Sequence, residues 1–317
     1  MKDLSQATAN IGKFQDSHVT ADGQDRASVA LSNPETLWFN TGTLCNIECA
    51  NCYIFSSPSN DALAYISADE VQIYLDQIEE RNWPVKEIGF TGGEPFMNPQ
   101  MINMTRLALA RGYRVLILTN AMAPMMRKTV QAGLSQLNSD FPNQMVIRVS
   151  LDHFDSDVHD AERGAGSFAK TLLGMQWLQE NGFSMAVAGR SQWGDSDADS
   201  RVGYAALFTE HEFSIDAYNP GQTVLFPEMD AAVEVPEITT ACWGILDKSP
   251  NDVMCSSSRM VVKRKGASSP TVLACTLLPY SLEFELGQTL AEAERDVHLN
   301  HAHCAKFCVL GGASCSA

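Results

Sequence analysis

Short apolar runs alternate with longer amphipathic stretches from residue 36 to about residue 220. The apolar runs predict strands at 36–41, 87–91, 114–119, 145–151, 184–189 and 214–219. The amphipathic stretches predict one helix behind a capping box at Ser67–Glu70, a second over 101–111 and a third over 167–180. This alternation is typical of parallel strands covered by helices, so we expect an α/β fold. A barrel and a doubly wound sheet give the same pattern, and periodicity does not separate them.

The chain changes character towards both ends. Residues 1–35 are polar and lack a regular period, so we interpret them as an N-terminal extension. Residues 236–317 break the alternation, because 260–263 and 271–274 predict a hairpin around Gly266 and 290–299 predicts a helix. We therefore expect an extension over 1–35, an α/β core over 36–235 and a small C-terminal domain over 236–317.

Charge and hydropathy exclude several classes of protein. The 317-residue chain has a formal net charge of −16, which disfavours binding to nucleic-acid phosphates and to anionic lipid. No apolar run approaches the roughly 18 residues that a membrane-spanning helix needs, and Met1–Gln6 leads into no apolar segment of a secretory signal. We expect a cytoplasmic protein with no nucleic-acid or membrane partner.

Nine cysteines are many for a chain in a reducing compartment, where metal ligation or catalysis is more common than disulfide bonding. They form two groups separated by nearly two hundred residues. The first group is Cys45, Cys49 and Cys52, and the second is Cys242, Cys255, Cys275, Cys304, Cys308 and Cys315. The division indicates two metal sites.

The first group has the spacing CxxxCxxC and follows the first predicted strand, where the loops of α/β folds carry active sites. Three neighbouring thiolates can bind three irons of a 4Fe-4S cluster and leave the fourth iron open for chemistry. The alternatives are a zinc site and a ferredoxin-like cluster whose fourth ligand is distant in sequence.

The stretch CNIECANCY, from Cys45 to Tyr53, resembles the signature of the radical S-adenosylmethionine (radical SAM) superfamily. It differs at Asn51, where many members carry an aromatic residue. The resemblance implies a partial (β/α)6 TIM-like barrel and an open iron that binds S-adenosylmethionine. It also implies a 5′-deoxyadenosyl radical that abstracts hydrogen from a substrate, and a flavodoxin- or ferredoxin-type electron donor.

Four further segments match the family. Thr91–Pro95 resembles its GGE segment, in which Gly92 and Gly93 allow a close backbone approach and Glu94 counters the cofactor's ammonium group. Alone, a Gly-Gly pair is also a common turn. Thr119–Ala121 resembles a TNG segment, which implies that Asn120 contacts the ribose, although Asn also simply terminates strands. Ser150 and Arg163 correspond to residues that bind the methionine carboxylate, and the alternative for Arg163 is a surface ion pair.

The surroundings of these segments leave some roles open. His153 stands where the family usually has Gly. We interpret His159 as a structural hydrogen-bonding residue. Asp152, His153 and His159 are candidate bases, and the sequence selects none of them.

The second group of cysteines resembles a twitch or SPASM-like auxiliary-cluster domain. The resemblance implies a second 4Fe-4S cluster on Cys255, Cys275, Cys304 and Cys308, with Cys315 as a possible replacement and Cys242 as a free thiol. A structural zinc site is the alternative, because His301 and His303 lie beside Cys304.

These observations predict a radical SAM oxidoreductase that acts on a small molecule or a peptide, with the second cluster as electron acceptor. The short N-terminal extension favours a small molecule over a leader-bearing peptide. The alternatives are a radical peptide maturase or crosslinking enzyme, a non-catalytic carrier with two clusters, and a zinc-stabilised binding protein.

Overall fold

The computed structural model of the chain describes residues 12–191, 193–227 and 234–312. Within these ranges nine strands form one sheet in the order β10-β9-β8-β2-β3-β4-β5-β6-β7. Strands β2 to β7 are parallel and follow the order of the chain. They are Thr36–Asn40, Glu87–Thr91, Arg114–Thr119, Met145–Ser150, Ser184–Arg190 and Thr223–Phe226. In the described residues the edge strands β7 and β10 do not pair, so the six parallel strands form a partial barrel.

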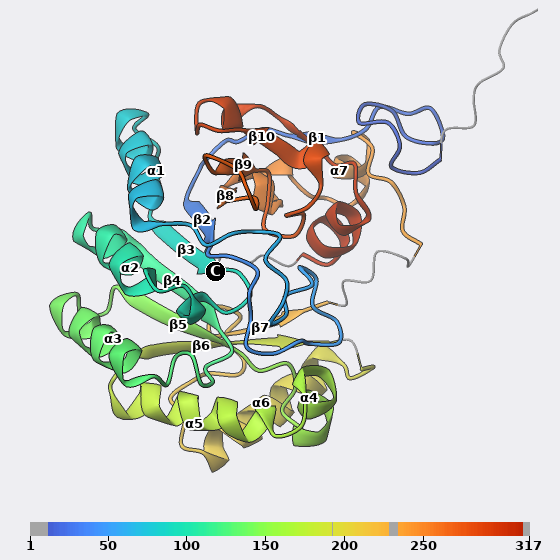
Figure 1. The fold of residues 1–317 in the computed structure, drawn as a ribbon. Coiled ribbons are helices and arrows are strands. Elements are labelled where there is room, and N and C mark those ends of the chain that lie inside the picture. The colour runs from blue at the N-terminus through green and yellow to red at the C-terminus, as the bar shows by residue number, and fades with distance from the viewer. Residues whose placement is uncertain (1–11, 192, 228–233, 313–317) are drawn as a thin grey trace, which may run out of the picture.

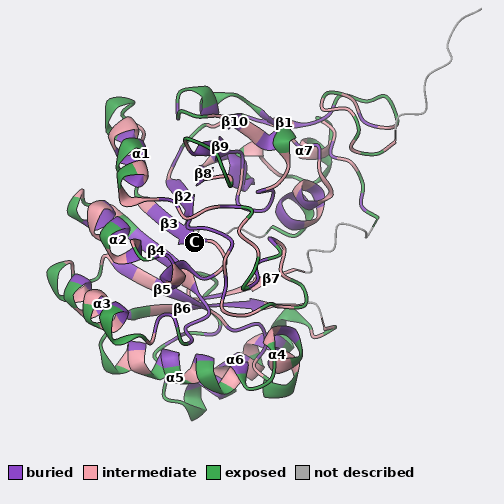
Figure 2. Cartoon of the chain, viewed as in Figure 1, coloured by how far each residue is buried: buried purple, intermediate pink, exposed green. Residues whose placement is uncertain are grey.

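Helices α1 to α6 cover the outer face of these strands (Figure 1). They are Ala68–Glu80, Met101–Ala110, Lys128–Asp140, Ser156–Arg163, Ser167–Glu180 and Asp197–Glu210. Buried residues lie mainly on the strands, and exposed residues lie mainly on the outer turns of the helices and on loops (Figure 2). None of the helices in the described ranges is long and apolar enough to cross a bilayer.

The capping box at the start of α1 is confirmed. Ser67 Oγ accepts a hydrogen bond from the Glu70 amide at 3.2 Å, and Glu70 Oε2 accepts one from the Ser67 amide at 2.8 Å. The helix buries Val71, Tyr74, Leu75 and Ile78, the face that the sequence pattern predicts. Local propensity and tertiary packing therefore agree in this element.

The C-terminal part extends the sheet of the barrel. Strand β8 (Ser258–Val262) pairs in parallel with β2, and β9 (Thr271–Leu273) and β10 (Glu285–Gly287) continue it antiparallel. The predicted hairpin is thus confirmed, and Gly266 in its turn has φ 77°. Short helical segments of this part are α7 (Cys242–Ile245) and a π-helix over Cys304–Leu310.

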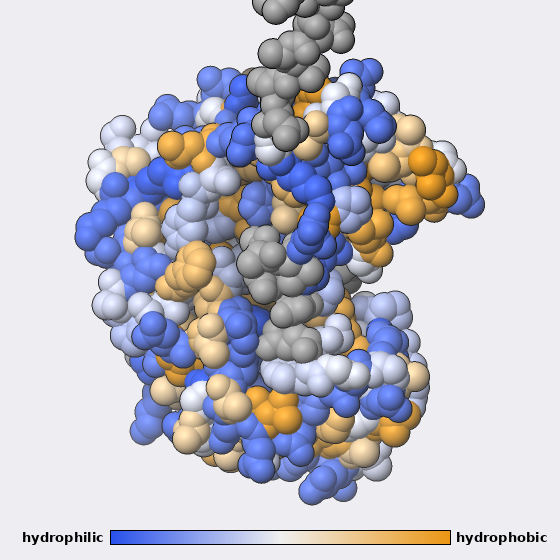
Figure 3. Space-filling view, turned by 90° about the vertical axis from the view of Figure 1, so that its right-hand side faces the viewer, coloured by the Kyte–Doolittle hydropathy of each residue, from blue (hydrophilic) through white to orange (hydrophobic). Residues whose placement is uncertain are grey.

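The described residues of the N-terminal extension pack on the C-terminal part. Strand β1 (Ser28–Val29) pairs antiparallel with β11 (Val297–His298). The buried Arg26 guanidinium forms an ion pair with Glu237 at 2.5 Å. Seen from the side, the surface is hollowed between this upper part and the part that carries α4 to α6 (Figure 3).

Two predicted elements are wrong. Residues 214–219 form turns because Asp216 and Asn219 accept hydrogen bonds from amides two residues later, and the sixth strand of the core is β7 instead. Residues 290–299 form only a 3-10 turn (Glu292–Glu294) and β11. There the carbonyl oxygens of Ala293 and Arg295 accept from the buried Arg259 side chain instead of continuing a helix.

Candidate active site

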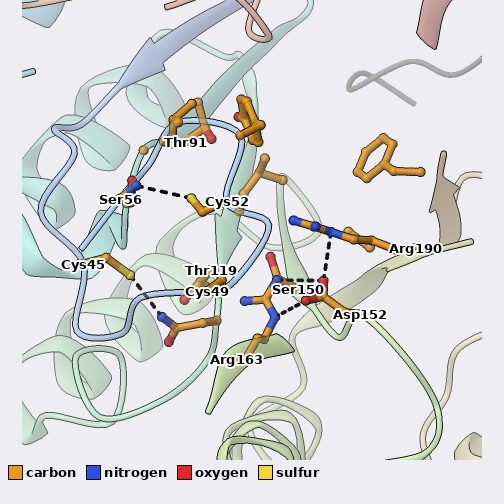
Figure 4. A pocket seen from close by; sticks show the side chains of 18 of the residues that line it. Cys45, Cys49, Cys52, Ser56, Thr91, Thr119, Ser150, Asp152, Arg163 and Arg190 are labelled. Carbon is orange, nitrogen blue, oxygen red and sulfur yellow. Dashed lines mark hydrogen bonds and ion pairs between the residues drawn. The ribbon is translucent and has the colours of Figure 1, made fainter. Parts of the chain in front are cut away.

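The three cysteines of the first group lie in the loop between β2 and α1 and line one cavity at the carboxyl ends of the parallel strands (Figure 4). The cavity encloses about 990 Å³ of empty space, part of it open to solvent. Most of the residues of the core that the sequence predicts to bind S-adenosylmethionine also line this cavity. They are Tyr53, Gly92, Gly93, Asn120, Ser150 and Arg163.

Backbone hydrogen bonds fix the shape of the cysteine loop. The Cys45 amide donates to the Ser57 carbonyl at 3.0 Å, and the Ser56 amide donates to Cys52 Sγ at 3.3 Å. Burial raises the pKa of the Cys45 thiol to about 12 and that of Cys49 to about 11 in the metal-free protein. Iron must therefore displace protons from these thiols when it binds.

Asn51, the residue that departs from the family signature, ties the loop to α4. Its amide and its side chain donate to the Glu162 carboxylate at 2.8 and 2.7 Å, and the Ala50 amide donates to the Glu162 carbonyl at 2.9 Å. Arg190 adds a hydrogen bond to the Asn51 carbonyl at 3.0 Å. Glu162 and Arg190 were not found by the sequence analysis, because neither lies in a recognisable motif.

Gly92 and Gly93 pack directly against the cysteine loop. The Gly93 amide donates to the Gly42 carbonyl at 2.8 Å, and the Glu94 amide donates to the Leu44 carbonyl at 3.1 Å. A Cβ on Gly93 would lie 2.3 Å from the Leu44 oxygen, and a Cβ on Gly92 would lie 2.6 Å from the Gly42 oxygen. Because they have no side chain, these glycines allow the cysteine loop to pack close to the end of β3, and their backbone faces the cavity.

Glu94 is 1% exposed and lies behind the cavity wall, outside the set of residues that line it. Its carboxylate accepts hydrogen bonds from Thr119 Oγ1 at 2.8 Å and from the amides of Asn120 and Phe96 at 2.9 and 3.2 Å. Burial raises its pKa to about 7, against the lowering effect of these donors. In the structure Glu94 therefore joins β3 to β4, and its predicted contact with an ammonium group stays a prediction.

Asn120 points towards the first cysteine. Its side chain donates to Asn46 Oδ1 at 2.9 Å and lies 3.9 Å from Cys45 Sγ. The next residue, Ala121, has φ 56°, in the left-handed region that favours glycine. This backbone explains why Ala121 corresponds to the glycine of a TNG segment. The proposed ribose contact of Asn120 stays a prediction.

Arg163 is not a surface ion-pairing residue. It binds the carboxylate of Asp152 in a buried bidentate pair, with Nε–Oδ2 at 2.6 Å and Nη2–Oδ1 at 2.8 Å (Figure 4). Arg190 approaches the same carboxylate at 3.5 Å. Burial raises the pKa of Asp152, but the two guanidinium groups outweigh it and hold the pKa below its usual value. Sequence analysis missed this pairing, because the partners lie on different elements.

The three candidate bases are poorly placed for proton transfer in the cavity. Asp152 lines it but has a lowered pKa. His153 contacts Asp195 at 3.0 Å and accepts from the Asp155 amide, away from the cavity lining. His159 is fully buried, and in the described structure neither ring nitrogen has a hydrogen-bond partner. Its interpretation as a structural hydrogen-bonding residue is therefore wrong.

A second cavity lies beside the first and is lined by four cysteines, Cys255, Cys275, Cys304 and Cys308. Each thiolate of a fully ligated cluster binds a different iron, so thiols spread around one cavity fit such a cluster. In the described residues no three metal-ligating side chains converge on a single ion position. The remaining lining is apolar, and His301 and His303 are not part of it.

Cys242 lines neither cavity in the described structure. Cys242 is half-buried in α7, and its sulfur lies 3.4 Å from the amide and the hydroxyl of Thr239. Cys315 lies outside the described residues.

Neighbouring residues of the same two segments line the two cavities. Phe307 lies between Cys304 and Cys308 in the π-helix and lines the first cavity, where it stacks on Phe226 at 5.6 Å between ring centroids. Leu277 lines the first cavity two residues after Cys275. In both segments, an apolar residue of the first cavity thus lies within three residues of a cysteine of the second.

A partial α/β barrel with three cysteines in the loop after its first strand has the architecture of an open-cluster iron–sulfur enzyme. The family model of the Radical SAM superfamily matches residues 39–189, which hold the cysteine loop and strands β3 to β6. Residues 39–189 therefore form a radical SAM domain, and enzymes of that superfamily use a 4Fe-4S cluster and S-adenosylmethionine.

Comparison with curated proteins finds relatives of different activity. The chain is 29% identical over 192 residues to the antilisterial bacteriocin subtilosin biosynthesis protein AlbA of Bacillus subtilis. The match covers 59% of this chain and 41% of AlbA. It is 27% identical over 164 residues to the AdoMet-dependent heme synthase of Methanosarcina barkeri, covering 50% of this chain and 43% of that protein. The matched part thus spans less than half of either relative.

Among solved structures, Streptococcus suis SuiB bound to S-adenosylmethionine has a similar fold. The TM-score is 0.59 at 13% sequence identity, and the match covers 81% of this chain and 63% of SuiB. SuiB has also been solved bound to its precursor peptide SuiA. At this identity the likeness concerns the fold.

Proposed function

We propose that this protein oxidises a substrate by radical hydrogen abstraction, with one cluster at each of its two groups of cysteines. The observation that carries the proposal is that Leu277 and Phe307, which line the first cavity, lie on the segments that carry cysteines of the second. A substrate group held against these two residues would lie beside the segments of Cys275, Cys304 and Cys308. A carrier of electrons would need no cavity of this size beside its first cluster.

The residues present fit the cofactors of the family. Cys45, Cys49 and Cys52 would hold the first cluster, and Cys255, Cys275, Cys304 and Cys308 the second. When bound, the first cluster and S-adenosylmethionine supply a 5′-deoxyadenosyl radical that abstracts hydrogen, and the second cluster supplies an acceptor for one electron.

The protein's own groups position and insulate this chemistry. The backbone at Gly92 and Gly93 presents polar groups to the cavity beside the cysteine loop. Arg163 is oriented by Asp152, which fixes the guanidinium where it can meet a ligand carboxylate. Ile54, Leu277 and Phe307 exclude water from the reacting side of the cavity.

A peptide is the substrate class that the relatives favour. AlbA is a biosynthesis protein for the bacteriocin subtilosin, and SuiB binds a precursor peptide. The apolar wall formed by Phe226, Leu277 and Phe307 suits an aliphatic or aromatic side chain. A small molecule is the second candidate, because the heme synthase matches the same part of the chain.

The test is cofactor cleavage by anaerobically reconstituted protein reduced with dithionite. The wild type and the Cys242→Ala control should release 5′-deoxyadenosine, and Cys49→Ala should release none. No release from wild-type protein would favour the two-cluster carrier. Co-expression with short peptides encoded beside the gene then tests the substrate class, since oxidation would lower the peptide mass by two hydrogens.

A further inference from the structure

Arg259 is a buried cation hydrogen-bonded to the backbone of Cys255, one of the residues that line the second cavity. It lies in β8 and is 1% exposed. Cys255 precedes β8 and Cys275 follows β9, and because the two strands are antiparallel, both cysteines lie at the end of the hairpin where Arg259 is. The guanidinium donates to the Cys255 carbonyl at 2.5 Å, which joins it directly to the backbone of a proposed cluster ligand.

Only neutral acceptors surround this guanidinium in the described part of the chain. Nε donates to the Ala293 carbonyl at 2.9 Å, Nη1 also to the Ser258 carbonyl at 2.9 Å, and Nη2 to the Arg295 carbonyl at 3.4 Å. The titratable groups that act on it are the thiols of Cys255 and Cys275 and the exposed Asp296.

Two other arginines with nearly buried side chains show a contrast. Arg26 forms an ion pair with Glu237 at 2.5 Å, and Arg163 forms one with Asp152 at 2.6 Å. A buried guanidinium cannot escape its charge by losing a proton, so an unpaired one is costly. Carbonyl dipoles accept hydrogen bonds from Arg259 but carry no net negative charge to balance it, and Asp296 is exposed to solvent.

We propose that Arg259 supplies the counter-charge of the second cluster and raises its reduction potential. The inference rests on the proposed function, in which Cys255, Cys275, Cys304 and Cys308 bind that cluster. A cubane cluster with four thiolates is an anion, and one-electron reduction adds one further negative charge. A fixed cation beside it therefore stabilises the reduced form more than the oxidised form.

The experiment compares Arg259→Met, which is neutral and of similar length, with Arg259→Lys, which keeps the charge. Arg264→Met is the matched control, because it removes a positive charge from the same hairpin at a half-buried position paired with Glu285. Iron content is measured first. The reduction potential of the second cluster is then titrated with dithionite in full-length protein that also carries Cys45→Ala, Cys49→Ala and Cys52→Ala.

We expect Arg259→Met to lower the reduction potential of the second cluster or to lose that cluster. Arg259→Lys should keep a higher potential, or more iron, than Arg259→Met. Arg264→Met should leave both unchanged. Equal potentials in the Met variant and the parent would overturn the inference, as would equal loss of iron in the Met and Lys variants. If the parent itself binds no second cluster, the proposed function fails first, and the inference falls with it.

Discussion

Substitution of Gly93 by alanine tests how the cysteine loop is held. The added Cβ would lie 2.3 Å from the Leu44 carbonyl oxygen and 2.7 Å from the Thr43 oxygen, both in the backbone of the segment that leads into Cys45. Backbone atoms cannot rotate away as a flexible side chain can. The loop must therefore retreat from β3 by about 1 Å to restore an ordinary van der Waals contact.

The retreat weakens the two hydrogen bonds that join the residues after β3 to the segment before Cys45. They run from the Gly93 amide to the Gly42 carbonyl and from the Glu94 amide to the Leu44 carbonyl. Each is worth about 1 kcal/mol, and overpacking a well-filled site costs about 1–3 kcal/mol more. The total of roughly 3–5 kcal/mol falls on the loop that carries Cys45, Cys49 and Cys52. The second cavity shares no backbone with this contact and should keep its cluster.

The assay is iron content together with the visible absorption of reconstituted protein. Gly93→Ala should lose about four of roughly eight irons per chain, whereas Gly244→Ala, where no atom lies within 4 Å of the new Cβ, should lose none. Full iron loading of Gly93→Ala with normal cofactor cleavage would refute this account of the glycine pair. Loss of all iron from the variant would refute the independence of the two sites.

Three further changes probe other parts of the site. Asp152→Ala leaves Arg163 and Arg190 without their shared carboxylate and should lower the free energy of unfolding by about 3–5 kcal/mol in urea titrations. A loss below about 1 kcal/mol would mean that Arg163 and Asp152 do not form the buried ion pair that the structure indicates. Gly174→Ala places a Cβ 1.9 Å from the Ala121 carbonyl oxygen and should sharply lower the melting temperature, whereas Ala121→Gly, at φ 56°, should change stability by less than about 1 kcal/mol. Cys255→Ala should reduce iron to about four per chain and stop substrate oxidation while 5′-deoxyadenosine release continues, and retention of all iron would exclude Cys255 as a ligand.

The sequence correctly predicted the helices and strands that depend on interactions between residues close together in the chain. Strands over 87–91 and 114–119 and the helix over 167–180 have the bounds that the pattern predicts. The capping box gave the start of α1 because both of its partners lie within four residues. The CxxxCxxC spacing likewise predicted three neighbouring cysteines, and the loop is short enough to bring all three to one cavity.

Long-range partners account for what the sequence did not predict. The pairing of β8 with β2 joins residues more than two hundred positions apart, so the continuity of the sheet between core and C-terminal part has no local signature. The contact of Asn51 with Glu162 and the pair of Arg163 with Asp152 also join different elements. Residues 290–299 also have a distant partner, because the carbonyls of Ala293 and Arg295 accept hydrogen bonds from Arg259 in β8.

The central claim is that three thiolates leave one iron free to bind S-adenosylmethionine. Electron paramagnetic resonance of the reduced first cluster tests it directly, in protein whose Cys255, Cys275, Cys304 and Cys308 are replaced by alanine. Addition of S-adenosylmethionine should change the spectrum of that cluster, because the ligand binds to its iron. A well-formed 4Fe-4S signal that the cofactor leaves unaltered would contradict the account.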